Sequence, residues 1–117
     1  MLTPHLKTKI RYQPDVAIID LIGEINTETE TILNGAYTEA SSQKTRAILL
    51  NLSEVKYITS AGIALLVDLL RRTRQTGHQL VAFGLSRHYQ EIFRMMHLTD
   101  FVNVFPDEAT ALKQIAS

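Results

Sequence analysis

The 117-residue sequence predicts one α/β domain over residues 1–117, with a mixed, mostly parallel sheet of about five strands and with four helices. Short apolar runs alternate with amphipathic segments of helical period, and this order favours right-handed crossovers between parallel strands. Near the amino terminus, two strand-like segments are separated only by the turn Gln13-Pro14-Asp15. A hairpin at that end would make the sheet mixed. A chain of this length has room for one compact domain and not for two.

The first two strands are expected to form this hairpin. Over residues 6–12, apolar and polar side chains alternate, which is the period of a half-buried strand with a cationic outer face. Lysines on that face also suit an edge strand, because charge discourages unwanted pairing. The second strand covers Val16–Ile22, an apolar run that contains Asp20. A lone acid in a strand usually lies on an open face or in an ion pair, so we interpret Asp20 as structural.

A first helix and a third strand follow. Asn26 or Thr27 can cap the helix, with acidic residues near its positive end. The apolar residues at helical spacing are Ile32, Leu33, Ala36, Tyr37 and Ala40. The run Ala47–Leu52 is almost continuously apolar, which predicts a strand buried on both faces. We expect residues 53–62, SEVKYITSAG, to form the loop after that strand.

The rest of the chain predicts three more helices and two more strands. The longest helix covers residues 61–76 and ends at Gly77, with three arginines near its negative end. The later elements are, in order, a strand over residues 80–85, a helix after the cap Ser86, a strand over residues 101–105 and a helix opened by Pro106 and Asp107. The apolar residues assigned to these two helices are Ile92, Phe93 and Met96, and Ala109, Leu112 and Ile115.

Composition and charge argue against several classes of protein. Twelve basic and twelve acidic residues give a net charge of zero, whereas a nucleic-acid-binding domain normally carries a basic face. Without cysteine there is no disulfide, no thiolate metal site and no cysteine nucleophile. The apolar stretches are too short to span a bilayer, and the start, MLTPHLKTK, lacks the apolar core of a signal peptide. We therefore expect a cytoplasmic protein with no nucleic-acid partner and no membrane insertion.

Familiar catalytic signatures are missing from the sequence. It lacks a GxxxxGK[ST] phosphate loop, a GxGxxG turn after a strand and a GxSxG nucleophile elbow. The histidines His5, His78, His88 and His97 are scattered, and no pair has the spacing of a metal-binding helix face. We therefore expect no catalytic residue, no metal site, no cofactor and no enzymatic activity. One enzymatic alternative remains, in which Ser60 is a nucleophile activated by a distant histidine.

Residues 57–66, YITSAGIALL, hold the strongest candidate site. Loops at the carboxyl ends of parallel strands are the usual place for function, and Ser60 lies in such a loop. It stands at or next to the N-cap of the longest helix. The plainest interpretation is structural, because a serine or threonine oxygen is a favoured N-cap.

The longest helix has two apolar sides. The stripe expected to face the sheet contains Ile63, Leu66, Val67 and Leu70. Leu65 and Leu69 fall on roughly the opposite side. They could form a docking surface, or a neighbouring helix could cover them, and the sequence favours neither interpretation.

Residues 48–53, ILLNLS, and residues 55–63, VKYITSAGI, together resemble the signature of STAS domains, in particular of the bacterial anti-sigma factor antagonists. Residues 23–26, GEIN, are similar to a Gly-Glu-Leu-Asp turn of that family. The order of the predicted elements agrees with a single STAS-type domain over essentially the whole chain. The chain differs from the common motif at four positions: Asn26, Asn51 and Thr59 stand where Asp is frequent, and Ala61 where Ser is frequent.

The resemblance implies partner switching. Unphosphorylated antagonists of this family bind a GHKL-type serine kinase that also acts as an anti-sigma factor, and a sigma factor is thereby released. The kinase phosphorylates the motif serine, which corresponds to Ser60 here, and the complex breaks. A PP2C-type phosphatase restores the binding form. Thr59 is a secondary candidate for phosphorylation.

The expected partner-binding residues come from this resemblance and from the helix geometry. They are Gly23, Glu24, Asn26, Thr27, Thr59, Ala61, Gly62, Ile63, Leu65 and Leu69. An alternative function is a scaffold or sensor STAS module of a stressosome-like or transport-linked assembly, in which Ser60 is only a helix cap. Phosphorylation of Ser60 by a kinase would distinguish the two functions.

Overall fold

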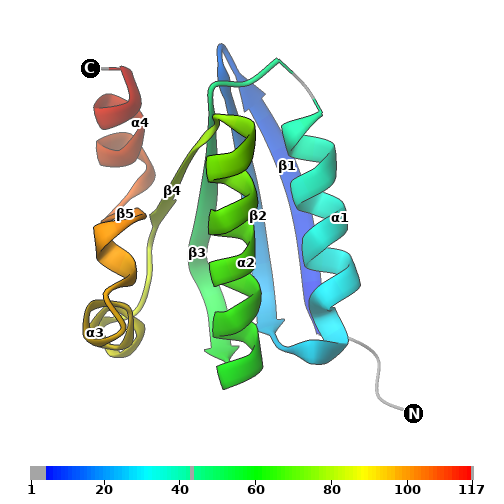
Figure 1. Cartoon of the computed structure of the whole chain (residues 1–117), viewed down its shortest axis with the longest axis vertical. Coiled ribbons are helices and arrows are strands. Elements are labelled where there is room, and N and C mark those ends of the chain that lie inside the picture. The colour runs from blue at the N-terminus through cyan, green and yellow to red at the C-terminus, as the bar shows by residue number, and fades with distance from the viewer. Residues whose placement is uncertain (1–4, 43, 117) are drawn as a thin grey trace.

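Five strands form one sheet in the order β1-β2-β3-β4-β5 in the computed structural model, which describes residues 5–42 and 44–116 (Figure 1). The strands are β1 (Leu6–Gln13), β2 (Val16–Ile25), β3 (Ala47–Ile58), β4 (Gln79–Phe83) and β5 (Asn103–Phe105). β1 is antiparallel to β2, and each later strand is parallel to its neighbour. The predicted α/β class and mixed, mostly parallel sheet are confirmed. The domain expected over residues 1–117 extends beyond the described residues at both ends.

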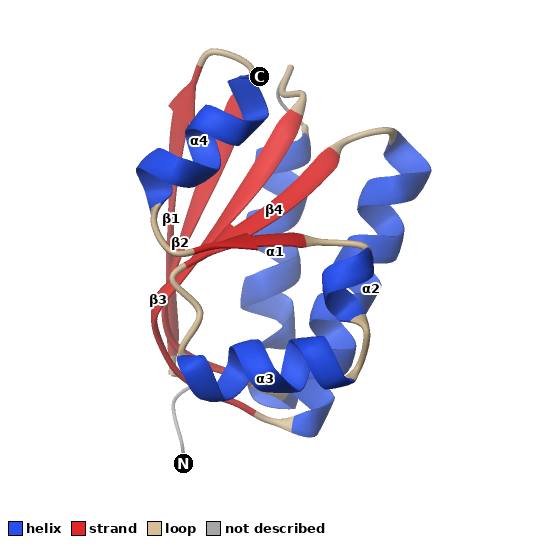
Figure 2. Ribbon diagram, turned by 90° about the vertical axis from the view of Figure 1, so that its left-hand side faces the viewer, coloured by secondary structure: helices blue, strands red, loops and turns tan. Residues whose placement is uncertain are grey.

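Helices cover both faces of the sheet. They are α1 (Glu30–Ser41), α2 (Ser60–Thr76), α3 (Arg87–Met95) and α4 (Glu108–Ala116), with two short 3-10 helices, η1 (Thr27–Thr29) and η2 (Leu98–Asp100). α1, α2 and α3 pack on one face, and α4 packs on the other (Figure 2). The four predicted helices are therefore present, and the sheet separates two apolar layers.

The central strands are buried on both faces, as their nearly continuous apolar sequences predict. Ala17 and Ile19 of β2 point into the layer beneath α1 and α2, whereas Ile18 points into the layer beneath α4. Leu50 and Leu49 of β3 divide between the two layers in the same way. Because successive side chains of a strand alternate between faces, each apolar residue contributes to one layer or the other.

β3 is longer than the sequence predicts. A loop was expected over residues 53–62, but β3 continues to Ile58. The reason is that β2 also extends, to Ile25, so that the two strand ends pair in parallel and satisfy each other's backbone groups. Thr59 alone separates β3 from α2.

Three apolar positions assigned to strands or helix faces are exposed. Met96 is 51% exposed because it follows the end of α3 and does not lie on the buried side of that helix. Phe101 is 55% exposed and precedes β5, which begins two residues later. In α4, Ala109 is exposed and Ala111 is buried. Ala111 and Ile115 are four residues apart, and this pair turns toward the sheet.

An ion-pair network on the α4 face joins the first strands to the last helix. Arg11 of β1 donates hydrogen bonds to both carboxylate oxygens of Asp20 in β2, at 2.7 and 2.8 Å, and to Glu108 of α4, at 2.6 and 3.1 Å. Asn51 of β3 also donates to Asp20, at 2.8 Å. Asp20 is thus paired, as its structural interpretation predicts. The amide of Asn51 suits this position, because a second carboxylate could not donate the bond.

We predict that this network makes the fold less stable in acid. Hydrogen bonds from Arg11 lower the pKa of Asp20 against the opposing effect of burial, and Asn51 adds to the lowering. Such a carboxylate stabilises the fold above its unfolded pKa of about 4, and this contribution is lost as the pH falls through the lower folded pKa. Near neutral pH, Asp20→Asn should therefore reduce the free energy of unfolding by about 1–2 kcal/mol.

The difference between wild type and Asp20→Asn should shrink as the pH falls through the lowered pKa of Asp20, because the wild-type carboxylate then becomes protonated as well. Urea denaturation of both proteins over a series of pH values from neutral into acid measures this. A difference that stays constant over the series would contradict the assigned role of Asp20.

Candidate functional site

The carboxyl ends of β2 and β3 meet the start of α2 at one edge of the sheet, at the lower end of Figure 1. The backbone N–H of Thr59 donates to the carbonyl of Ile25 at 3.1 Å. Gly62 lies against the same carbonyl, since a Cβ at residue 62 would be 2.1 Å from the Ile25 oxygen. No side chain fits in that space, so glycine is required there. We call this contact of Ile25, Thr59 and Gly62 the β2–α2 junction.

Thr59, and not Ser60, is the N-cap of α2. The Thr59 Oγ1 accepts a hydrogen bond from the backbone N–H of Gly62 at 3.0 Å. Ser60 is the first helical residue and is exposed, and its hydroxyl makes no hydrogen bond with the described part of the chain. Ser60 therefore lies next to the N-cap, one of the two positions that the sequence allows, and its interpretation as the cap itself is wrong. The sequence could not separate the two residues, because serine and threonine both cap helices well.

Tyr89 of α3 closes the other side of the β2–α2 junction. Its hydroxyl accepts a hydrogen bond from the backbone N–H of Ile58 at 2.8 Å and donates to the Ile58 carbonyl at 3.3 Å. β4 pairs with β3 only as far as Asn51, so the buried hydroxyl takes the place of a neighbouring strand at Ile58. Sequence reasoning missed Tyr89. The one sequence feature that could have pointed to it is an aromatic side chain with a polar hydroxyl among the apolar residues of α3.

The turn after β2 is a second hydrogen-bonded unit beside the junction. Asn26 Oδ1 accepts from the backbone N–H groups of Glu28 and Thr29, at 2.9 and 3.1 Å. Thr29 Oγ1 accepts from the backbone N–H of Asn26 at 2.9 Å. This capping box starts η1 and confirms Asn26 as a cap before the first helix. Thr27 follows it and is exposed.

Gly23 and Glu24 hold the start of β1 beside the candidate site through contacts with the carbonyl of His5. Gly23 has a φ of 126°, and a Cβ there would be 2.1 Å from the carbonyl oxygen of His5. The backbone N–H of Glu24 donates to the same carbonyl at 2.7 Å. Both residues are half-buried, and their backbones hold the end of the hairpin against the turn.

The predicted outer side of α2 is partly covered. Leu69 is fully buried and Leu65 is half-buried, because α1 packs along this side of α2. A hydrogen bond of 2.7 Å between the hydroxyls of Tyr37 and Thr73 closes the same contact. The docking interpretation is therefore wrong for Leu69, and a neighbouring helix covers it. Val67, which the sequence assigns to the sheet side, is 38% exposed instead.

The remaining predicted residues gather near the start of α2. Ser60 is exposed, Ala61 is half-buried and Ile63 is buried beneath them. The Ser60 hydroxyl is thus accessible at the positive end of a 17-residue helix. Backbone N–H groups at a helix N-terminus favour an anion, so the position suits a negatively charged modification.

Catalytic and metal-binding arrangements are not seen in the described part of the chain. The four histidines all lie within it, and none forms a hydrogen bond with Ser60, so the serine-nucleophile alternative gains no support. No group of three or more His, Asp or Glu side chains among the described residues could hold a metal ion. None of the helices in the described ranges is both long and apolar enough to cross a membrane.

Comparison with known protein sequences gives a match over most of the chain. A model of the STAS domain family matches residues 7–111. The anti-sigma-B factor antagonist of Staphylococcus aureus is 30% identical over 82 residues, which are 70% of this chain and 76% of that protein. The chain therefore matches the family model over most of its length, and it also matches a relative of similar length.

Solved structures share the fold. An anti-sigma factor antagonist of Mycobacterium paratuberculosis has a TM-score of 0.78 at 21% identity and covers 96% of this chain and 95% of its own. The Bacillus cell fate determinant SpoIIAA in its phosphorylated form has a TM-score of 0.72 at 14% identity and covers 93% of this chain and 99% of its own. At these identities the likeness shows the fold alone.

We predict that Gly62→Ala destabilises the protein and that Gly35→Ala does not. The added Cβ at residue 62 would meet the Ile25 carbonyl, so the junction must open, and the free energy of unfolding should fall by about 2 kcal/mol or more. Gly35 in α1 has no atom within 4 Å of an added Cβ, so alanine should raise the free energy of unfolding by roughly 0.5–1 kcal/mol. Urea denaturation measures the contrast. A Gly62→Ala variant as stable as wild type would contradict the close contact.

Removal of the Tyr89 hydroxyl should weaken the end of β3. In Tyr89→Phe the buried N–H of Ile58 loses its partner, which costs about 1–3 kcal/mol. Tyr37→Phe is a matched control, because the Thr73 hydroxyl keeps its bond to the Leu69 carbonyl. Amide hydrogen exchange followed by NMR should accelerate at Ile58 in the first variant only. Unchanged exchange at Ile58 would show that the hydroxyl is not needed there.

Proposed function

The chain belongs to the STAS domain family, and we propose that it is an anti-sigma factor antagonist that works by partner switching. Unphosphorylated, it binds an anti-sigma factor that is also a GHKL-type serine kinase. The kinase phosphorylates Ser60, the complex dissociates, and a PP2C-type phosphatase restores the binding form. The protein is then a cytoplasmic regulator and kinase substrate rather than an enzyme. The antagonist role is the one that the name of the Staphylococcus aureus relative gives to that protein.

The exposed, unbonded hydroxyl of Ser60 is the observation that supports this function best. Because Thr59 makes the capping bond, the Ser60 hydroxyl can be modified without loss of a helix contact. Thr59, the secondary candidate, is half-buried, and its Oγ1 holds the Gly62 N–H. Phosphorylation of Thr59 would remove a cap worth about 1 kcal/mol. Ser60 is therefore the proposed acceptor.

The position of Ser60 on α2 explains how a phosphate could switch binding without a change of fold. A phosphoserine carries about −1.5 to −2 charges. In the free protein this group stays hydrated, and the helix N-terminus favours it. In an interface it must be desolvated beside the partner, and each 1.4 kcal/mol or so of that cost weakens binding tenfold.

The proposed contact surface surrounds Ser60. Its exposed or half-buried members are Gly23, Glu24, Asn26, Thr27, Thr59 and Ala61. Gly62 and Ile63 are buried and shape this surface from below. Leu65 is half-buried, so only the exposed part of its side chain can contribute to this surface. Leu69 is buried and belongs to the core.

Phosphorylation in vitro tests this function. We predict that a GHKL-type serine kinase of the same organism, incubated with the protein and ATP, adds one phosphate, which mass spectrometry assigns to Ser60. Ser60→Ala should stay folded and bind the kinase without being modified. Ser60→Asp should bind about tenfold more weakly or worse in calorimetry. Equal affinity of wild type and both variants would refute switching at Ser60.

The same assay addresses the scaffold or sensor alternative. A STAS module that does not switch would gain no phosphate from any GHKL-type kinase of the organism. Phosphate found on Thr59 instead would place the switch one residue earlier.

A further inference from the structure

The exposed side of α2 continues beyond Ser60 as a straight stripe. Its members are Ser60, Ala64, Val67, Arg71 and Arg74, all of them exposed. Their alternating spacing of four and three residues places them on one side of the helix. It is also the spacing with which one helix packs along another. This exposed seam starts at the proposed phosphorylation site, is apolar in its middle and ends in two cations.

Two hollows border the exposed seam on the side of α3 and η2. The first is lined by Ser60, Ile63, Ala64, Val67 and Met96. The second is lined by Val67, Leu70, Arg71, Arg74 and Phe101. Val67 lines both hollows, so they adjoin along the exposed seam, and we call the two together the groove.

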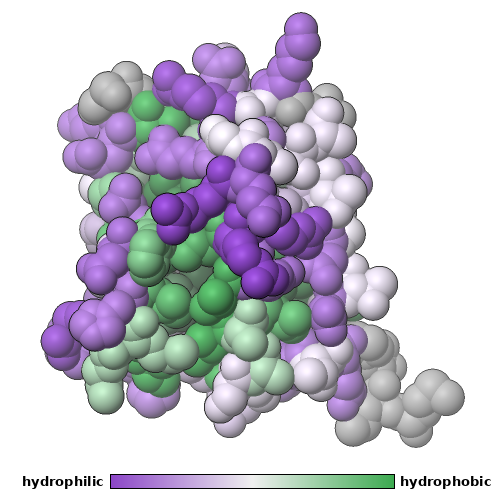
Figure 3. All heavy atoms as spheres, in the orientation of Figure 1, coloured by the Kyte–Doolittle hydropathy of each residue, from purple (hydrophilic) through white to green (hydrophobic). Residues whose placement is uncertain are grey.

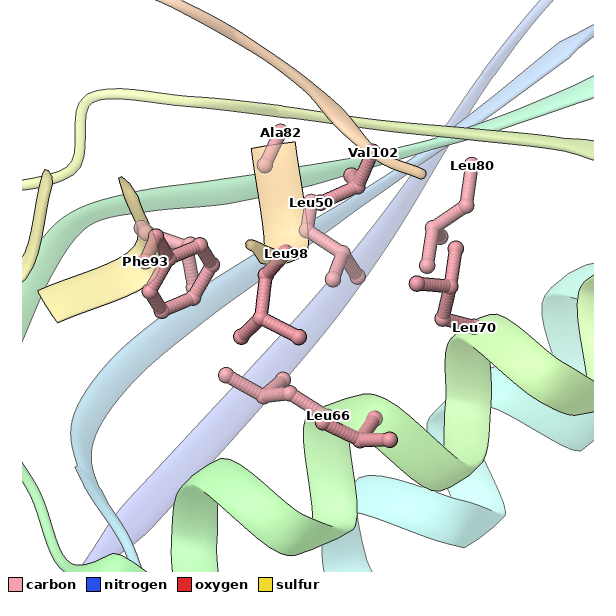
Figure 4. A pocket seen from close by; sticks show the side chains of 10 residues that line it. Leu50, Leu66, Leu70, Leu80, Ala82, Phe93, Leu98 and Val102 are labelled. Atoms are coloured by element: carbon pink, nitrogen blue, oxygen red, sulfur yellow. The ribbon is translucent and has the colours of Figure 1, made fainter. Parts of the chain in front are cut away.

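The groove is lined mainly by apolar side chains, with Ser60 at one end and Arg71 and Arg74 at the other. Met96 and Phe101 are both more than half exposed along it. Figure 3 shows the apolar surface gathered between α2 and α3, with a hollow in it. Beneath it, Leu66 and Leu98 point toward one another from α2 and η2 (Figure 4). An accessible apolar groove of this kind is a common mark of a protein-binding site.

The far end of the groove carries a positive charge that the described chain does not neutralise. The guanidinium of Arg74 lies 5.2 Å from the ring centroid of Phe101, and no carboxylate among the described residues pairs with it. Arg71, one turn earlier, pairs with Asp68. An acidic side chain from a partner would therefore meet Arg74, with the Phe101 ring shielding one side of the contact from water.

We propose that the groove binds one helix of the anti-sigma partner, with apolar side chains over Ala64, Val67 and Met96 and an acidic side chain at Arg74. The exposed seam suits the helix-in-groove mode of recognition, and methionine adapts its shape to a partner. This proposal rests on the proposed function and extends it, because Ser60 becomes one end of a longer interface. A second copy of the chain fits less well. In a parallel copy Arg74 would face the Arg74 of the other copy, and in an antiparallel copy it would face Ser60. Neither arrangement gives Arg74 an acidic partner.

Calorimetric binding of the full chain to the purified kinase that phosphorylates Ser60 tests the groove. In a double variant, Val67→Gln with Met96→Gln, the affinity should fall about tenfold or more, because two exposed apolar contacts are lost while the core is untouched. Arg74→Gln should weaken binding roughly threefold and make the affinity less dependent on salt. Tyr12→Gln and Lys9→Gln are matched controls, since these side chains are exposed on β1 at the other edge of the sheet. Both controls should bind like wild type.

The outcomes separate the two proposals. If Ser60→Asp weakens binding but the double variant binds like wild type, the groove proposal is overturned and switching at Ser60 stands. If no kinase of the organism phosphorylates Ser60, both proposals fail. If sedimentation shows that the free chain dimerises and that the double variant does not, the groove binds a second copy and the helix proposal is overturned. Equal urea midpoints for all variants confirm that folding is unaffected.

Discussion

The first turn of α2 packs on the end of β2 with no side chain between them, because Gly62 lies directly on the carbonyl of Ile25. The N–H of Thr59 bonds to that same oxygen, and Tyr89 holds the preceding residue, Ile58, from the opposite side. Segments far apart in the sequence therefore converge on one short stretch of backbone. None of these contacts uses the side chain of Ser60. They fix the position of its backbone at the start of α2 and leave its hydroxyl without a hydrogen bond to any described residue.

The same contacts account for the differences from the common STAS motif. Thr59 and Asn26 each supply one acceptor oxygen to a helix start, which is what an aspartate would supply at those positions. Asn51 donates to Asp20 as well, which a carboxylate could not do. With fewer carboxylates near the start of α2, a phosphate on Ser60 would meet less repulsion than it would beside aspartates. The substitutions are compatible with the proposed switch.

Local signals in the sequence predicted most of the fold, and the errors came from contacts between distant segments. Ser86 and Gly77 have the cap geometries that their residue types predict. The helical period showed that Leu69 and Val67 lie on different sides of α2, but it could not show that α1 covers the first and leaves the second exposed. Tyr89 escaped notice for the same reason, because its hydrogen bonds to β3 exist only once α3 has packed.

The stability of the chain with phosphoserine at residue 60 tests most directly whether the side chain of Ser60 contributes to the stability of the fold. The unfolding free energy of that protein, made with phosphoserine incorporated during translation, is compared with that of the unmodified chain in urea. The two should agree within about 1 kcal/mol, with the phosphorylated form equal or more stable, because the helix N-terminus favours an anion. A loss of several kcal/mol would mean that Ser60 supports the fold after all.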